Sequence, residues 1–286
     1  MFITAVPIAI RYMLLSALGF ALMAACVKAV SGYGIPVLEI VAARALVSLG
    51  LSYLDVKRKR ISIWGQHKPL LLARGVVGAL ALVCVYYSVT TLSLADATVL
   101  QYTYPAFTAV LALLFLGERI KLATMLCMLL SFVGVIVMMR PGEAGLIGLP
   151  MLSLFAALAG ALGSAIAYVI VRKLSQTEDS SVIIFYFPLV ALPTSLLLLG
   201  GDFVVPGMEA LLLLLLVGVF TQVGQIGLTK AMAAEEAGKA SAYAYVQVIF
   251  SAILGVIFFE EIPTLWTIIG GCLILAGALI NALWKR

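Results

Sequence analysis

Charged residues are scarce in this chain of 286 residues. Asp, Glu, Lys and Arg together make up 11% of it, whereas 64% is apolar, and the mean hydropathy is +1.19. A soluble domain is about a quarter charged and about half apolar. This shortage excludes an ordinary soluble domain and predicts an integral membrane protein embedded in a lipid bilayer.

The chain also has only one histidine and no cysteines at paired spacing. The only histidine is His67, and the four cysteines stand singly in apolar stretches. Metal sites and disulfide frameworks need such residues at characteristic spacings, so we expect no metal and no cofactor. Intramembrane hydrolysis would need an Asp pair, a Ser–His pair or a His-rich cluster within the membrane, so the sequence does not predict an enzyme.

Nucleic acid is an unsuitable partner as well. The net charge is +5, but the sequence has no basic stripe with interleaved aromatic residues. The positive charge is better explained by membrane topology.

What the sequence does contain is a series of apolar segments of about 20 residues, the length that crosses a bilayer as an α-helix. They predict an all-α protein with ten transmembrane helices and short links. The segments are 8–31, 36–56, 70–91, 96–116, 121–140, 149–171, 181–200, 209–230, 238–259 and 264–284.

The basic residues predict the orientation of these helices. Fifteen of the eighteen Lys and Arg residues fall on one side, and by the positive-inside rule that side is cytoplasmic. We therefore expect both termini in the cytoplasm of a multi-pass protein, in a bacterial inner (plasma) membrane. The fifteen are Arg11, Lys57, Arg58, Lys59, Arg60, Lys68, Arg74, Arg119, Lys121, Arg172, Lys173, Lys230, Lys239, Lys285 and Arg286; the exceptions are Lys28, Arg44 and Arg140.

The chain also contains an internal repeat. Residues 87–140 are echoed 143 positions later, which aligns Tyr102 with Tyr245 and Glu118 with Glu261. Five helices per repeat is an odd number, so the second copy must cross the membrane in the opposite direction. We therefore predict two inverted five-helix repeats, residues 1–143 and 144–286, around a central cavity.

Short motifs carry a resemblance to a known family. These motifs are Phe115 to Arg119 at the end of the fourth helix, Phe258 to Glu261 at the end of the ninth, Pro36 and Arg44 in the second, and Ala95 to Ala97 at the start of the fourth. With these motifs and ten helices in two inverted repeats, the chain resembles the EamA family of drug/metabolite transporters. The second repeat departs from the first, with Glu260 at the position of Gly117 and Pro188 at that of Arg44.

This resemblance implies secondary-active or facilitative transport of a small organic solute, usually outward. Together with the polar residues within the spans, this resemblance predicts an exporter or exchanger of an amino acid or related carboxylate, working by alternating access. A carrier of a nucleotide-like or cofactor metabolite is the alternative, and a lipid scramblase or channel is a weaker one. The sequence leaves a homodimer open.

Polar residues on shared helix faces are the candidate substrate contacts. Gln101, Tyr104 and Thr108 share one face of the fourth span, and Gln222 and Gln225 share one face of the eighth. Polar side chains in hydrocarbon must face protein, water or ligand, so the competing explanation is hydrogen bonding between helices. The full substrate-binding set is Arg44, Tyr87, Gln101, Tyr104, Thr108, Gln222, Gln225, Tyr243 and Gln247.

Arg44 is the most informative charge. It lies eight residues beyond Pro36, or about 12 Å into the membrane at 1.5 Å per residue. Glu39 is five residues away and off its helix face. Its partner is therefore Asp96, exposed carbonyl groups or a substrate carboxylate or phosphate; a structural ion pair remains the competing explanation.

Another set of residues has predicted gating or structural roles. Lys28 can snorkel to the membrane surface, and Glu118 and Glu261 end equivalent helices, where each is either solvated or part of a gate. Prolines within spans predict kinks. Carboxylates are absent from the middle of the spans, which favours facilitated transport or exchange over proton antiport. The full set is Lys28, Glu39, Asp96, Pro105, Glu118, Pro188 and Glu261.

Overall fold

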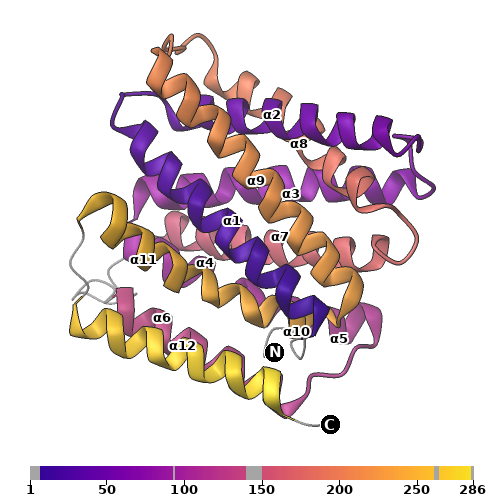
Figure 1. Cartoon of the computed structure of the whole chain (residues 1–286), viewed down its shortest axis with the longest axis vertical. Coiled ribbons are helices and arrows are strands. Elements are labelled where there is room, and N and C mark those ends of the chain that lie inside the picture. The colour runs from indigo at the N-terminus through magenta and orange to yellow at the C-terminus, as the bar shows by residue number, and fades with distance from the viewer. Residues whose placement is uncertain (1–6, 93, 140–149, 261–263, 285–286) are drawn as a thin grey trace.

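The computed structural model describes residues 7–92, 94–139, 150–260 and 264–284, and the part of the chain within these ranges is helical throughout, with no strand (Figure 1). The helices of the first half are α1 (Ile8–Ser31), α2 (Val37–Arg58), α3 (Lys68–Thr91), α4 (Leu94–Gln101), α5 (Tyr104–Leu116) and α6 (Leu122–Met139). Those of the second half are α7 (Met151–Leu174), α8 (Ser180–Leu199), α9 (Met208–Ala234), α10 (Ala237–Ala242), the 3₁₀ turn η3 (Tyr243–Tyr245), α11 (Val246–Phe259) and α12 (Leu265–Leu283).

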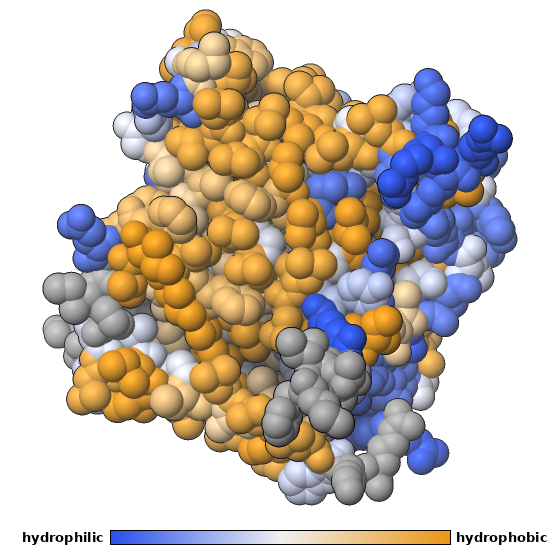
Figure 2. All heavy atoms as spheres, in the orientation of Figure 1, coloured by the Kyte–Doolittle hydropathy of each residue, from blue (hydrophilic) through white to orange (hydrophobic). Residues whose placement is uncertain are grey.

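These helices confirm the predicted spans, whose limits agree with them to within four residues. Among the described residues, nine helical segments are long and apolar enough to cross a membrane, and α6 is a shorter apolar helix. Figure 2 shows apolar side chains covering the middle of the molecule and hydrophilic ones gathered at one end of the helices. We call this end, which carries the α2–α3 and α7–α8 links, the basic end, and the other the opposite end.

Packing between helices follows a pseudo-two-fold symmetry that relates the two halves. α1 packs on α9, and their repeat equivalents α7 and α3 pack on each other in the same way. α2 packs on its own equivalent α8, and α6 on its equivalent α12, which places these pairs on the symmetry axis. Because each half has five crossings, equivalent helices run in opposite directions. The fold is therefore the predicted pair of inverted repeats.

Close backbone contacts obey the same symmetry. A Cβ atom added to Gly134 of α6 would lie 2.6 Å from the carbonyl oxygen of Gly270 on α12. A Cβ added to Gly277 of α12 would lie 3.0 Å from the carbonyl oxygen of Cys127 on α6. Gly277 is 143 positions after Gly134, and Gly270 is 143 positions after Cys127. Small residues thus let α6 and α12 touch at two equivalent points.

Both copies of the fourth transmembrane helix are interrupted by a tight turn at equivalent places, although each remains one span. In the first half α4 ends at Gln101 and α5 begins at Tyr104, and in the second half α10 and α11 are separated by η3. Tyr102 and Tyr245, which are repeat equivalents, stack there with ring centres 5.6 Å apart. The hydroxyl of Tyr245 also donates to the carbonyl oxygen of Tyr102 at 2.8 Å. The sequence predicted continuous spans here with a kink at Pro105, and the break actually precedes that proline.

Two lateral grooves accompany the α6–α12 pair. One has a volume of about 260 Å³ and the other about 240 Å³. Lining residues Ala106, Met128 and Phe132 of the first correspond, 143 positions on, to Ile249, Gly271 and Leu275 of the second. These apolar grooves lie between the fourth and fifth spans of each repeat. They therefore differ in position from the central cavity that the sequence predicted.

Candidate functional site

A row of polar residues along α7 organises the candidate site. Ser164, Tyr168 and Arg172 follow one another at intervals of four residues, so they lie on one face of the helix. This row runs from the interior of the bundle to the basic end. Each member contacts a different element of the first half.

The inner two members of the row bind residues that the sequence singled out. Gln101 donates through Nε2 to the hydroxyl of Ser164 at 3.2 Å, while its Oε1 is buried without a partner among the described residues. The ring of Tyr104 meets that of Tyr168 edge-on, with centres 5.3 Å apart. The structure therefore brings these two predicted contacts together against α7.

Two arginines lie next to these residues. Arg74 of α3 has its Cζ 5.0 Å from the centre of the Phe187 ring, and Arg44 of α2 has its Cζ 5.7 Å from the same ring. Arg44 also donates to the sulfur of Met23 at 3.7 Å. Both guanidinium groups lie near the hydroxyl of Tyr168. The site is thus a group of basic, aromatic and amide side chains contributed by both halves.

Arg74 corrects one detail of the sequence analysis, which counted it among the basic residues flanking the cytoplasmic links. Its side chain is only 3% exposed, and its Nε has no hydrogen-bond partner in the described ranges. Its position six residues into α3, about 9 Å along the helix, was the signal that separated it from Lys68 at the helix start.

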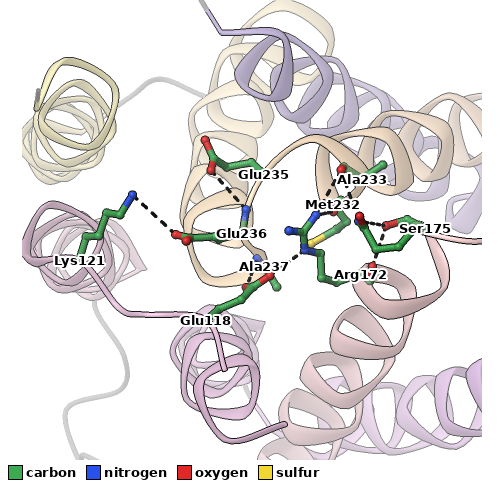
Figure 3. A network of polar contacts seen from close by, with 10 residues as sticks. Glu118, Lys121, Arg172, Ser175, Met232, Ala233, Glu235, Glu236 and Ala237 are labelled. Carbon is green, nitrogen blue, oxygen red and sulfur yellow. Dashed lines mark hydrogen bonds and ion pairs between the residues drawn. The ribbon is translucent and has the colours of Figure 1, made fainter. Parts of the chain in front are cut away.

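The outermost member of the row, Arg172, takes part in a network at the basic end (Figure 3). Its Nε donates to Oε1 of Glu118 at 2.7 Å, and its Nη1 donates to the carbonyl oxygen of Met232 at 2.7 Å. The other oxygen of Glu118 accepts from the backbone N–H of Ala237 at 2.6 Å. Glu118 is 13% exposed and Arg172 18%. We call Glu118, Arg172 and Ala237 the basic-end lock, since they join α5 to three helices of the second half.

A second set of contacts closes the same end between the α2–α3 link and the α7–α8 link. Lys59 pairs with Asp179 at 2.8 Å, and both backbone N–H groups of Gln66 and His67 donate to Glu178 at 2.6 Å. Burial opposes the charge of Asp179, but hydrogen bonds from Lys59 and Ser181 outweigh it and lower the pKa of Asp179. Burial likewise opposes the charge of Lys59, and the neighbouring carboxylates outweigh it and raise its pKa.

Other predicted substrate contacts lie elsewhere. Gln222 bridges α9 and α2, accepting from Ser48 at 2.6 Å and donating to Ser52 at 2.9 Å, as expected for bonding between helices. Thr108 donates to the carbonyl oxygen of Tyr104 in its own helix at 2.8 Å. Gln225 is buried and Gln247 is half-buried. Tyr243 is buried, and its hydroxyl has no hydrogen-bond partner among the described residues. Tyr87 lies at the periphery and is 40% exposed.

The predicted gating and structural residues are placed as follows. Glu39 accepts from the N–H of Val204 at 3.0 Å near the opposite end, and the ammonium group of Lys28 lies 4.4 Å from the centre of the Phe259 ring. Pro188 is buried within the continuous helix α8. Glu261 and the side chain of Asp96 lie outside the described residues.

Comparison with known proteins shows the family to which the chain belongs. The EamA-like transporter family matches the chain twice, at residues 7–140 and 151–283. The chain is 34% identical over 275 residues to the pseudopaline exporter CntI of Pseudomonas aeruginosa, covering 95% of both chains. It is 31% identical to solute carrier family 35 member G1 of Mus musculus, covering 96% of this chain and 78% of the mouse protein.

A solved crystal structure shares the fold, with a TM-score of 0.85 over 97% of both chains at 17% identity. The doubled family match corresponds to the two structural repeats. The chain is a multi-pass membrane transporter that belongs to the EamA-like transporter family.

Proposed function

We propose that the chain exports or exchanges a small organic solute bearing a carboxylate, by alternating access through two inverted repeats. The related CntI protein, at 34% identity, is an exporter of pseudopaline, which supports outward transport of a small metabolite. In this chain the solute would lie among Arg44, Gln101, Tyr104 and Tyr168. Basic and amide groups of this kind suit an anionic or zwitterionic solute.

The observation that carries this proposal is the break in both fourth transmembrane helices. Equivalent turns that meet at Tyr102 and Tyr245 give each half a local departure from regular α-helix where the two halves touch. In carriers with inverted repeats, substrate sites form at such discontinuous helices near the midplane. The conformation described here has the basic end joined by the basic-end lock. Exchange of the two repeat conformations would open that end and close the other.

The orientation follows from the basic residues. The stretch Lys57 to Arg60 and the residue Lys173 lie at the basic end, together with both ends of the described chain. By the positive-inside rule this end faces the cytoplasm of a bacterial inner membrane. A solute taken up at the basic end and released at the opposite end is exported.

Transport in this proposal is driven by the concentration gradient of the solute, or by exchange against a second solute. Glu39 is bound near the opposite end, and Glu118 is bound to Arg172 near the basic end. In the sequence, Asp and Glu residues stand near the ends of the predicted spans, so the chain places no carboxylate in the middle of a span for proton coupling.

Reconstituted transport tests the proposal. Purified protein is reconstituted into proteoliposomes that are loaded with unlabelled amino acids. Entry of labelled forms of the same amino acids is then followed with and without a pH gradient. We expect saturable uptake that is accelerated by solute on the far side and changes little with the gradient. Non-saturating flux without counterflow would indicate a channel, and movement of labelled lipid alone would indicate a scramblase. Strong acceleration by the proton gradient would refute the proposed energy source.

A further inference from the structure

Two arginines meet at one phenyl ring inside the bundle. Arg74 and Arg44 both lie within 6 Å of the centre of the Phe187 ring, at 5.0 Å and 5.7 Å. Neither guanidinium forms an ion pair with a carboxylate of the described residues. Within the described residues, the only polar contact of the Arg44 side chain is with the sulfur of Met23, and Nε of Arg74 is buried without a hydrogen-bond partner.

This arrangement is costly as a purely structural feature. A guanidinium group does not lose its charge in a protein, so the buried Arg74 carries a desolvated positive charge with the half-buried Arg44 nearby. Cation–π contact with one phenyl ring compensates such charges only weakly. A carboxylate between the two groups would satisfy both, because guanidinium binds carboxylate through two parallel hydrogen bonds.

We propose that Arg74 and Arg44 bind the carboxylate of the transported solute, an inference that rests on the proposed transport function. The Phe187 ring forms the apolar wall of this subsite. Arg74 is thereby a substrate contact that the sequence analysis had assigned to membrane topology.

The neighbouring residues indicate what lies beside the carboxylate. Oε1 of Gln101 is a buried acceptor without a donor in the described chain, while its Nε2 is held by Ser164. Ser164 lies one helical turn from Tyr168, whose hydroxyl is near Arg74, so the acceptor at Gln101 and the donors of Arg74 are about 6 Å apart along α7. A solute whose ammonium group binds Gln101 and whose carboxylate binds the two arginines would be an amino-acid-like zwitterion.

Gly78 makes this geometry sterically possible. A Cβ added to Gly78 would lie 2.5 Å from Nη1 of Arg74 and 2.8 Å from Cδ2 of Phe187. Replacement by alanine would therefore displace the guanidinium from the ring while leaving its charge in the protein. Gly78→Ala thus perturbs the subsite without removing the charge.

The subsite also lies close to the basic-end lock. Tyr168 is one helical turn from Arg172, which holds Glu118. A solute bound at the arginines therefore lies directly beneath the contacts that close the basic end.

Binding is tested by thermal unfolding of the purified protein in the presence of each common amino acid. The matched ligand is the corresponding amino-acid amide, in which an uncharged amide replaces the carboxylate. We expect one or more amino acids to raise the unfolding temperature. The amides should not, and Arg74→Gln, Arg44→Gln and Gly78→Ala should each remove the shift. Lys230→Gln is the matched control, because Lys230 makes a comparable cation–π contact, 5.3 Å from the Tyr12 ring, outside the subsite. This control should keep the shift.

Transport is measured in parallel on the same variants. Proteoliposomes are loaded with a bacterial cytosolic metabolite extract, and the solutes that leave are identified by mass spectrometry. Arg74→Gln should slow release of carboxylate solutes about thirtyfold or more, the loss expected when one partner of a buried charge pair is removed. Arg74→Lys, which keeps the charge but not the two parallel hydrogen bonds, should be intermediate. Lys230→Gln should release at the wild-type rate.

The two readouts separate the subsite from the transport function. Release that is fast in wild type and equally fast in Arg74→Gln would overturn the subsite and leave the transport proposal standing. A carboxylate-specific thermal shift without any release above protein-free vesicles would support the subsite and refute transport. Absence of any amino-acid shift in wild type, or a shift kept by all three variants, would overturn the subsite. If Arg74→Gln does not fold, Arg44→Gln and Gly78→Ala decide the question.

Discussion

Glu118→Gln should open the basic end. The variant removes the negative charge that binds Arg172 at 2.7 Å while keeping the size of the side chain. With both groups less than a fifth exposed, loss of the pair costs about 2 kcal/mol, the lower limit for a hydrogen-bonded charge pair that is desolvated. Because the lock exists only when the basic end is closed, this energy changes the equilibrium between closed and open forms by about thirtyfold.

Cysteine labelling measures that change. Native cysteines are replaced, and Ala112→Cys, buried beside the lock at 1% exposure, is reacted with a water-soluble maleimide. We expect about thirtyfold faster labelling with Glu118→Gln than without it. Ala191→Cys, buried at 2% exposure in α8, reports general loosening and should not change.

A second variant in the same network is the matched control. Lys121 lies 3.9 Å from Glu236, and both side chains are about a third exposed. Such a surface pair contributes at most about 1 kcal/mol, so Lys121→Gln should change labelling less than about fivefold. Equal labelling in Glu118→Gln and in the parent protein, or equal effects of the two variants, would refute the assignment of Glu118 to a conformational lock.

Three further predictions concern stability in detergent. Glu260 has a left-handed backbone, φ +54°, so Glu260→Gly should raise the free energy of unfolding by about 0.5–1 kcal/mol; a decrease in denaturant titration would contradict this. Gly134→Ala should lower it by about 1–3 kcal/mol, because the new Cβ meets the α12 backbone, whereas Gly271→Ala, with open space around it, should not. Because its pKa is lowered, Asp179 contributes its full stabilisation above the unfolded pKa of about 3.9, and this stabilisation is lost as the pH falls through the folded pKa. Because its pKa is raised, Lys59 contributes its full stabilisation below the unfolded pKa of about 10.4, and this stabilisation is lost as the pH rises through the folded pKa. Asp179→Asn should therefore flatten the pH dependence of unfolding temperature below about pH 4, and an unchanged profile would argue against the link.

The helical spans could be predicted from sequence because lipid imposes one simple rule. A bilayer requires about 20 consecutive apolar residues with every backbone group bonded within the helix, so hydropathy locates each span. The repeat was visible for a related reason, since Gly134 and Gly277 must both be small where α6 and α12 touch. These constraints act locally or at a fixed offset along the chain.

The break in the fourth spans could not be located in the same way. Pro105 suggested a kink in the first half, but the second half has a break at Tyr243 to Tyr245 without any proline. Stacking of Tyr102 on Tyr245 joins residues 143 positions apart, and no local pattern announces that contact. Tertiary packing, which sequence periodicity does not contain, sets the position of both breaks.

The candidate site was predicted in part for a similar reason. Gln101 and Tyr104 were found because polar residues at helical spacing stand out in an apolar span. Gln222 has the same spacing, yet it bonds Ser48 and Ser52 of α2, and only the structure distinguishes these two uses of glutamine. Arg74 was missed because a basic residue near a helix end is usually a topological signal.

Alternating access is tested most directly by two distances measured on one protein. Spin labels at Phe115 and Gln176 report on the basic end, and labels at their exact repeat equivalents, Phe258 and Tyr33, report on the opposite end; all four side chains are exposed. With Glu118→Gln, pulsed electron paramagnetic resonance should show the basic-end distance increasing and the opposite-end distance decreasing. Two distances that change in the same direction, or a basic-end change with no response at the opposite end, would contradict exchange of conformations between the repeats.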